Sequence, residues 1–131
     1  MNILAIETSC DETACAVVKD GTTIISSALA TSAEMYQKYG GIVPEVAARR
    51  QLESILPVIT EALRPIQNGS SNQPLQGVPL QTLIQRSIDA IAVTVGPGLI
   101  GSLLVGVETA KTIAFATGLP IIPVNHVLAH M

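Results

Sequence analysis

The chain opens with the apolar run Asn2-Ile3-Leu4-Ala5-Ile6-Glu7, whose length and composition predict a buried β-strand. The polar run Thr8-Ser9-Cys10-Asp11-Glu12-Thr13 follows as a tight loop, and residues 14–19 predict a second strand that returns antiparallel to the first. Asp20-Gly21 is a hairpin turn signal, and the β-branched residues after it predict a third strand over residues 22–30. Three strands joined by hairpins therefore begin a sheet before any helix forms.

A long helix and a polar loop follow these strands. Pro44 can occupy the first turn of the helix, and Glu45 suits the positive end of its dipole. One apolar stripe recurs at spacings of three and four residues and consists of Leu52, Ile55, Leu56, Ile59 and Leu63. Pro57 falls inside the stripe, so we expect a kink or a break of the helix there. Residues 67–81 are rich in Asn, Gly, Ser, Gln and Pro and predict a surface loop.

The second half of the chain alternates strand and helix. Residues 87–95 predict a buried strand, residues 99–117 a helix and residues 120–124 a short strand. Asn125 is well placed to cap a helix that begins at His126. The chain has no Trp, one Phe and two Tyr, so aliphatic side chains must build the core. These features together indicate an α/β fold, a mixed sheet with helices on both faces.

Length and composition restrict the class of protein. The 131 residues fit one domain, and 48% apolar with 13% charged residues describe a well-buried globular chain. A net charge of −3 offers no basic surface for nucleic acid. Cys10 and Cys15 favour reduced thiols in the cytoplasm over a disulfide framework. Residues 90–107 carry no charge, but Gly96-Pro97-Gly98 divides them, so a buried strand, a turn and a helix explain them better than a membrane span.

Gly96, Gly98 and Gly101 form a G-x-G-x-x-G pattern between a predicted strand and a predicted helix. A dinucleotide site also needs an acid at the end of the next strand, but that strand ends in Val124-Asn125-His126. Two interpretations remain. The backbone N–H groups of this loop could bind an anionic ligand, or the loop could be a tight turn where helix and strand pack closely.

The loop after the first strand is a second candidate site. A strand that leads into an acidic, hydroxyl-bearing loop and out by a second strand is how sugar-kinase and actin-like ATPases hold phosphate and its metal. Hydroxyl and amide groups bind the phosphate oxygens there, and a carboxylate positions metal or water. The alternative is a hairpin loop in which Ser and Asp side chains merely support the turn.

His126 and His130 are the only histidines of the chain. Two histidines at i and i+4 project from one face of a helix, which is the spacing that a single metal ion needs. A zinc protease helix carries Glu directly after the first histidine as general base, whereas Val127 stands here. This disfavours hydrolysis of that kind and leaves metal binding open; the alternative is a chance pair.

Five motifs taken together resemble one family. They are Ile6-Glu7-Thr8-Ser9-Cys10-Asp11-Glu12-Thr13, Tyr39-Gly40-Gly41-Ile42-Val43-Pro44-Glu45, Gly96-Pro97-Gly98-Leu99 with Gly101-Ser102-Leu103-Leu104-Val105-Gly106, Ala110-Lys111, and His126-x-x-Ala129-His130. Their order and spacing are similar to those of the universal tRNA threonylcarbamoyladenosine synthase family, formerly described as O-sialoglycoprotein endopeptidases. The resemblance covers essentially all of the chain.

This resemblance implies an actin/hexokinase/Hsp70-type ATPase fold, in which residues 1–131 form the N-terminal lobe of a two-lobe enzyme. Members transfer the threonylcarbamoyl group from threonylcarbamoyl-adenylate to N6 of adenosine 37 of tRNA. By resemblance, His126 and His130 are two ligands of one divalent metal, Fe²⁺ or Zn²⁺, and the third is an aspartate of the second lobe. Asp11 and Glu12 are implied as catalytic residues.

The resemblance also assigns substrate and phosphate binding to Ser9, Gly96, Gly98 and Gly101. Implied partners are tRNA, a catalytically silent paralogue and a small ATPase, in the cytoplasm and without a membrane. The rival interpretation makes this chain the silent paralogue itself, a dimerisation scaffold, but such paralogues lack the histidine pair. A metalloprotease is disfavoured because of Val127.

We also expect the helix that begins near Pro44 to form a homodimer or heterodimer contact around Leu56 or Ile59, because an uncovered apolar patch usually recruits a partner. The 131-residue chain by itself is expected to bind metal weakly and to show no transferase activity.

Overall fold

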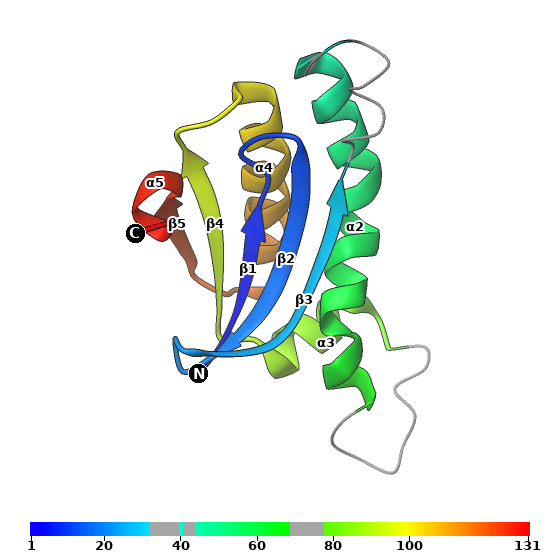
Figure 1. Cartoon of the computed structure of the whole chain (residues 1–131). Coiled ribbons are helices and arrows are strands. Elements are labelled where there is room, and N and C mark those ends of the chain that lie inside the picture. The colour runs from blue at the N-terminus through cyan, green and yellow to red at the C-terminus, as the bar shows by residue number, and fades with distance from the viewer. Residues whose placement is uncertain (32–39, 41–43, 69–77) are drawn as a thin grey trace.

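The structure is a computed structural model that describes residues 1–31, 40, 44–68 and 78–131. These residues form a sheet with helices packed against it (Figure 1). The strands are β1 (Asn2–Glu7), β2 (Glu12–Lys19), β3 (Thr23–Thr31), β4 (Ala90–Gly96) and β5 (Ile121–Asn125). The helices are α2 (Pro44–Asn68), α3 (Leu80–Ser87), α4 (Ile100–Thr117) and α5 (His126–Ala129).

The strands form one mixed sheet in the order β3-β2-β1-β4-β5. Two hairpins make β1, β2 and β3 antiparallel neighbours. β4 pairs parallel with β1, and β5 pairs parallel with β4. In this register Ile6 lies opposite Val93, and Thr94 lies opposite Val124. The carboxyl ends of β1, β4 and β5 therefore meet at the same edge of the sheet.

The three longer helices lie on one side of the sheet. α2 contacts β2 and β3, α4 contacts β1 and β4, and α3 packs against α2 and α4 (Figure 1). The core between sheet and helices is aliphatic, with Leu4, Ile59, Leu63 and Ile91 fully buried. Burying each of these side chains contributes about 1.5–3 kcal/mol relative to leaving it exposed. This core holds the strand ends in fixed positions.

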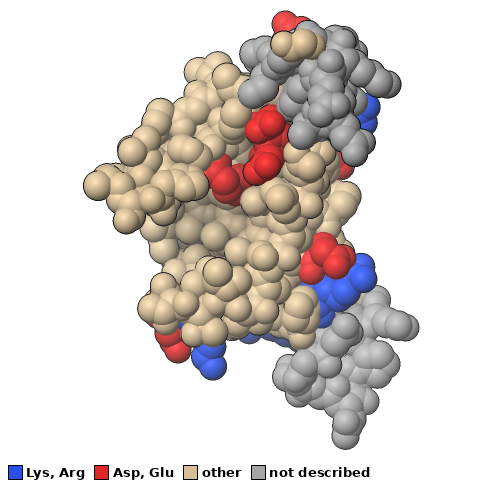
Figure 2. Space-filling view, in the orientation of Figure 1, with Lys and Arg blue, Asp and Glu red and all other residues tan. Residues whose placement is uncertain are grey.

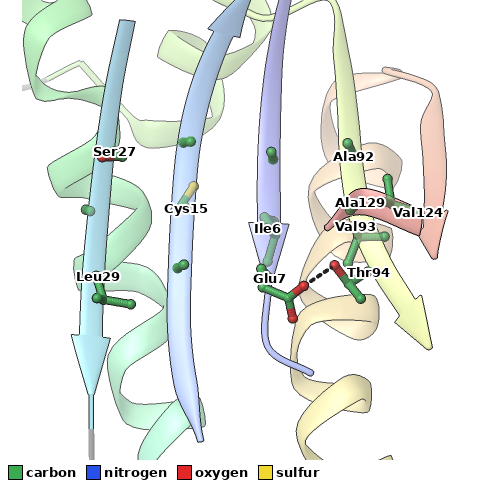
Figure 3. Close-up of a pocket in the computed structure, with 14 residues that line it drawn as sticks. Ile6, Glu7, Cys15, Ser27, Leu29, Ala92, Val93, Thr94, Val124 and Ala129 are labelled. Carbon is green, nitrogen blue, oxygen red and sulfur yellow. Dashed lines mark hydrogen bonds between the residues drawn. The ribbon is translucent and has the colours of Figure 1, made fainter. Parts of the chain in front are cut away.

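The opposite face of the sheet carries small side chains. Ala5, Ala14, Ala16 and Ala92 line a shallow trough of about 480 Å³ across β1, β2 and β4 (Figure 3). Ala129 of α5 also lines this trough. The helices are thus distributed unequally among the described residues, with α5 alone on the trough face.

The predicted α/β fold and mixed sheet are confirmed, but α2 differs from its prediction in two respects. Of the expected kink or break at Pro57, the break does not occur, because the helix continues through this residue. Its predicted apolar stripe is also divided. Ile59 is fully buried against the sheet, whereas Leu52 and Leu56 are 66% and 56% exposed beside α4. The sheet therefore covers a narrower strip of α2 than the apolar pattern predicts, which leaves these leucines on the surface.

α3 is a helix that the sequence analysis missed. Its eight residues present only Leu83 and Ile84 as buried side chains, too few for a clear apolar period. Helices this short depend on tertiary packing, here on α2 and α4. The predicted surface loop 67–81 is shortened at both ends by α2 and α3, and its residues 69–77 lie outside the described residues. In the motif Tyr39-Gly40-Gly41-Ile42-Val43-Pro44-Glu45, residues 39 and 41–43 lie outside them as well.

The uncharged segment 90–107 forms β4, a turn and the start of α4, as predicted. α4 is the one helix of the described ranges that is long and apolar enough to cross a membrane by length and composition. Its contacts with β1, β4 and α2 are those of a helix that packs on a sheet.

Candidate functional site

Three strand ends bring several predicted site residues together. β1 is followed by Ser9, β4 is followed by Gly98, and β5 leads directly into His126. Ser9, Gly98 and His126 line one hollow of about 330 Å³. In open α/β sheets, ligands bind outside the carboxyl ends of neighbouring parallel strands. This hollow is therefore the candidate site.

The loop after β1 is fixed to α4 through Thr8, which is fully buried. Its hydroxyl donates to the carbonyl oxygen of Ser102 at 2.7 Å and accepts from the N–H of Gly106 at 3.1 Å. Because Ser102 and Gly106 are four residues apart in one helix, a single hydroxyl joins the end of β1 to one turn of α4. This contact sets the distance between the loop and the helix.

Ser9 and Gly98 lie in contact at the mouth of the hollow. The carbonyl oxygen of Ser9 accepts from the N–H of Leu99 at 2.8 Å. A side chain at Gly98 would overlap the backbone of Ser9, so glycine is needed for this close approach. Gly96, at the end of β4, has a φ of 154°, a conformation that L side chains rarely adopt. Backbone geometry therefore requires glycine at positions 96 and 98, apart from the phosphate-binding role predicted for these residues.

A buried glutamine holds the rest of the loop. Gln51 of α2 is 1% exposed, and its Nε2 donates to the carbonyl oxygens of Thr8 at 3.3 Å, Cys10 at 2.9 Å and Glu12 at 2.9 Å. The sequence analysis did not single out this residue. A polar side chain four positions before Ile55, on the buried side of α2, was the signal that could have found it.

Glu7 is the second site residue that the sequence analysis did not single out. Its Oε2 accepts from the Thr94 hydroxyl at 2.6 Å (Figure 3), and its Oε1 accepts from the N–H of Ser9 at 2.5 Å. Nδ1 of His126 lies 3.2 Å from Oε2. Burial raises the pKa of Glu7, but hydrogen bonds from Ser9, Thr94 and His126 outweigh burial and hold this pKa below its usual value. The Glu7 carboxyl is therefore ionised at neutral pH.

The histidine pair lies at the start of α5. The Asn125 side chain accepts from the N–H groups of Val127 at 2.9 Å and Leu128 at 3.1 Å, which confirms the predicted cap. The imidazole centroids of His126 and His130 are 4.6 Å apart. Neutral imidazoles suit iron and zinc, so these residues fit two positions of such a site. Within the described ranges, no third His, Cys, Asp or Glu completes a cluster.

The remaining predicted residues lie around the hollow or away from it. Asp11 is partly exposed in the loop, and Glu12 is exposed at the start of β2. Burial raises the pKa of the Cys10 thiol, and the charges of both acids raise it further. Figure 2 shows acidic side chains gathered near the upper ends of the central strands. Gly101 is not brought to the hollow, because it lies in the first turn of α4 facing Ala48 of α2.

This chain is similar to known proteins over most or all of its length. The family model TsaD, tRNA N6-adenosine threonylcarbamoyltransferase, matches residues 23–131. Proteins of that name from Thermomicrobium roseum and Geobacter metallireducens are 50% and 52% identical to the whole of this chain, which covers 32% and 34% of their length. The chain thus spans about a third of the curated relatives it matches.

A solved structure, YeaZ from Pseudomonas aeruginosa, matches 95% of this chain and 43% of its own, with a TM-score of 0.58 and 22% identity. At that identity the likeness shows the fold alone. The family matches confirm the family identified from the motifs. The chain belongs to the tRNA N6-adenosine threonylcarbamoyltransferase family.

Proposed function

We propose that this chain forms the N-terminal lobe of a two-lobe enzyme that transfers a threonylcarbamoyl group from threonylcarbamoyl-adenylate to N6 of adenosine 37 of tRNA. The observation that carries the proposal is the juxtaposition of the imidazole pair His126 and His130 with the Ser9 loop at the strand ends. In the reaction, the N6 amine attacks the acyl carbon and forms a C–N bond. The bond between that carbon and the phosphate oxygen of the adenylate breaks, AMP leaves with that oxygen, and the amine loses a proton.

His126 and His130 supply two ligands for one divalent metal, Fe²⁺ or Zn²⁺, and an aspartate of the second lobe supplies the third. When bound, such a metal acts as a Lewis acid toward a carbonyl oxygen. The neutral imidazoles and the carboxylate suit either metal.

The other residues of the hollow bind and orient the adenylate. No side chain within the described ranges caps the first turn of α4, and the backbone N–H groups at such a helix start favour an anion. Gly98 allows the backbone on both sides of the hollow to approach a phosphate. Ser9 contributes its hydroxyl, and Asp11 and Glu12 serve as the candidate catalytic carboxylates at the rim. Gly96 and Gly101 hold the turn and the helix that carry these groups.

The contacts to tRNA come from other surfaces, since this lobe has a net charge of −3. We also propose a protein-partner surface in the groove between α2 and α4. The groove measures about 540 Å³ and is lined by Leu52, Leu56 and Leu104, whose side chains are between 51% and 66% exposed. The silent paralogue or a second copy of this chain fits such an apolar surface. Ile59 is buried and takes no part in this contact.

A tRNA substrate and the two free thiols fit an enzyme of the cytoplasm. The small ATPase is its proposed partner there. A scaffold without catalysis would have no use for the histidine pair. A metalloprotease would need a general base where Val127 stands.

The experiment joins this chain to the remainder of the Geobacter metallireducens relative and measures modified adenosine on unmodified tRNA by mass spectrometry. Purified threonylcarbamoyl-adenylate is supplied. The joined protein should modify tRNA, the 131-residue chain should not, and His126→Ala or His130→Ala should abolish the product. Glu61→Gln, an exposed change on α2, is the matched control and should retain activity. Product formation by the histidine variants at the control rate would reject the proposal.

A further inference from the structure

Glu7 has no part in the transfer proposed above, yet its carboxylate contacts three other residues of the site. We propose that Glu7 is the positioning residue for His126. It holds the neutral imidazole in the tautomer that carries its proton on Nδ1, so that the lone pair of Nε2 is presented to the ligand. The inference deepens the proposed function and rests on it only for the identity of that ligand as a metal.

A carboxylate oxygen of Glu7 and a ring nitrogen of His126 meet at hydrogen-bond distance. Oε2 of Glu7 lies 3.2 Å from Nδ1 of His126. An ionised carboxylate is an acceptor only. If Nδ1 carried no proton, its lone pair would face a negatively charged oxygen at hydrogen-bond distance, in a site only about a third exposed. A proton on Nδ1 turns this repulsion into a charge-assisted hydrogen bond.

The Oγ of Ser9 lies 3.0 Å from the same Nδ1. A serine hydroxyl can donate as well as accept, so this contact taken by itself would allow the opposite tautomer. The Glu7 carboxylate has no such freedom, because it can only accept. With a proton on Nδ1, Ser9 and Glu7 can both accept from it, whereas an unprotonated Nδ1 would leave Glu7 facing a lone pair. Glu7 therefore decides the tautomer, and the Ser9 hydroxyl adapts to it.

The Glu7 carboxylate is held in place by further hydrogen bonds. Thr94 donates to Oε2 at 2.6 Å, and the backbone N–H of Ser9 donates to Oε1 at 2.5 Å. Glu7 and Thr94 stand on paired parallel strands, β1 and β4. Oε2 is thus held from β4 and Oε1 from the loop after β1, by hydrogen bonds that do not involve the imidazole. Partners of this kind orient a ligating histidine, and their loss typically lowers metal affinity about 10- to 100-fold.

The decisive test reads the tautomer in the metal-free chain. Two-dimensional ¹⁵N–¹H NMR of the imidazoles, at about pH 8.5 where histidines are ordinarily neutral, distinguishes a protonated from an unprotonated ring nitrogen. We expect Nδ1–H for His126 in the wild-type chain. Glu7→Gln and Thr94→Val should both shift His126 toward the Nε2–H form, which free histidine prefers. Thr94→Ser, which keeps the hydroxyl, should restore the wild-type pattern.

Two controls separate positioning from general damage. Glu61→Gln removes an exposed carboxylate elsewhere and should leave the His126 signals unchanged. Ser9→Ala removes the other group near Nδ1 and should retain the Nδ1–H form. An Nε2–H form in the wild-type chain, or an Nδ1–H form that survives both Glu7→Gln and Thr94→Val, would overturn the proposal.

A zinc titration followed by the same NMR signals is the second readout. We expect Glu7→Gln to weaken zinc binding about 10- to 100-fold relative to Glu61→Gln. Equal zinc affinities in the two variants would reject the positioning role of Glu7 but not the proposal that His126 and His130 bind a metal. Zinc that perturbs neither imidazole of the wild-type chain would reject the metal part of the proposed function. The tautomer result would still decide the role of Glu7.

Discussion

An added methyl group at Gly106 of α4 should lower the free energy of unfolding. A Cβ at this position would lie 2.5 Å from the Thr8 hydroxyl oxygen, which is buried and cannot move into solvent. Gly101 lies in the same helix, and a Cβ there would meet Ala48 at an ordinary 3.5 Å. Gly106→Ala and Gly101→Ala are therefore the same chemical change in one helix with opposite expected effects on stability.

The magnitude follows from the contacts. Displacing Thr8 weakens its two hydrogen bonds, to Ser102 and from Gly106, at about 1 kcal/mol each. Overpacking a filled site adds about 1–3 kcal/mol. The higher helix propensity of alanine relative to glycine offsets this by about 1 kcal/mol. Gly106→Ala should thus lower the free energy of unfolding by about 2–4 kcal/mol, whereas Gly101→Ala should leave it unchanged or raise it by up to about 1 kcal/mol.

The assay is urea unfolding followed by circular dichroism, with the free energy taken from linear extrapolation. Thr8→Ala provides the internal test, because it removes the hydroxyl that the new methyl group would strike. In that background, Gly106→Ala should cost little, which gives a coupling energy of about 1–3 kcal/mol between the two sites. Equal effects of Gly106→Ala and Gly101→Ala, or purely additive effects of the Thr8 and Gly106 changes, would refute this account of the β1–α4 contact.

Three further predictions concern other parts of the lobe. Gln51→Leu should lower the free energy of unfolding by about 1–3 kcal/mol and speed amide hydrogen exchange in residues 8–12; unchanged exchange would contradict it. Burial raises the pKa of Cys15 to about 12, so mass spectrometry should find Cys10 alkylated before Cys15 at neutral pH. Simultaneous alkylation of both thiols would contradict this. For the same reason, the free energy of unfolding should fall as the pH rises from about 9 toward 12, because in that range the thiol ionises in the unfolded chain but not in the folded one. Leu56→Asp should weaken self-association or partner binding in light scattering while changing the free energy of unfolding by less than about 0.5 kcal/mol. Ile59→Asp, at a buried position, should instead unfold the chain. Association that Leu56→Asp leaves unchanged would reject the groove as a partner surface.

Sequence patterns predicted the sheet well because its signals are local. The first strand, the two hairpins and the Asn125 cap each depend on residues within a few positions of one another. The division of the α2 stripe was not predictable in this way. Leu56 and Ile59 are equally apolar, and only the position of β2, β3 and α4 around the helix decides which of them is buried.

The same difference separates the parts of the site. The histidine pair and the loop that contains Ser9 could be singled out from the sequence because their residues lie close together along the chain, and their roles stay predictions. Glu7 and Gln51 were missed because their partners are distant in sequence, Thr94 and His126 for Glu7 and the loop carbonyls for Gln51. Gly98 and Gly101 look alike in the motif, yet one lies against Ser9 and the other faces α2. Tertiary packing makes that distinction, and a pattern in a single sequence does not contain it.

We propose that His126 and His130 form this lobe's part of a metal site that a second lobe completes. The measurement is iron bound per protein after anaerobic loading of this chain joined to the remainder of the Geobacter metallireducens relative. We predict one iron per joined protein, its loss in His126→Ala and in His130→Ala, and only weak binding by the 131-residue chain. Tight iron binding that persists in both histidine variants, or that is equally tight in the 131-residue chain, would contradict the shared site.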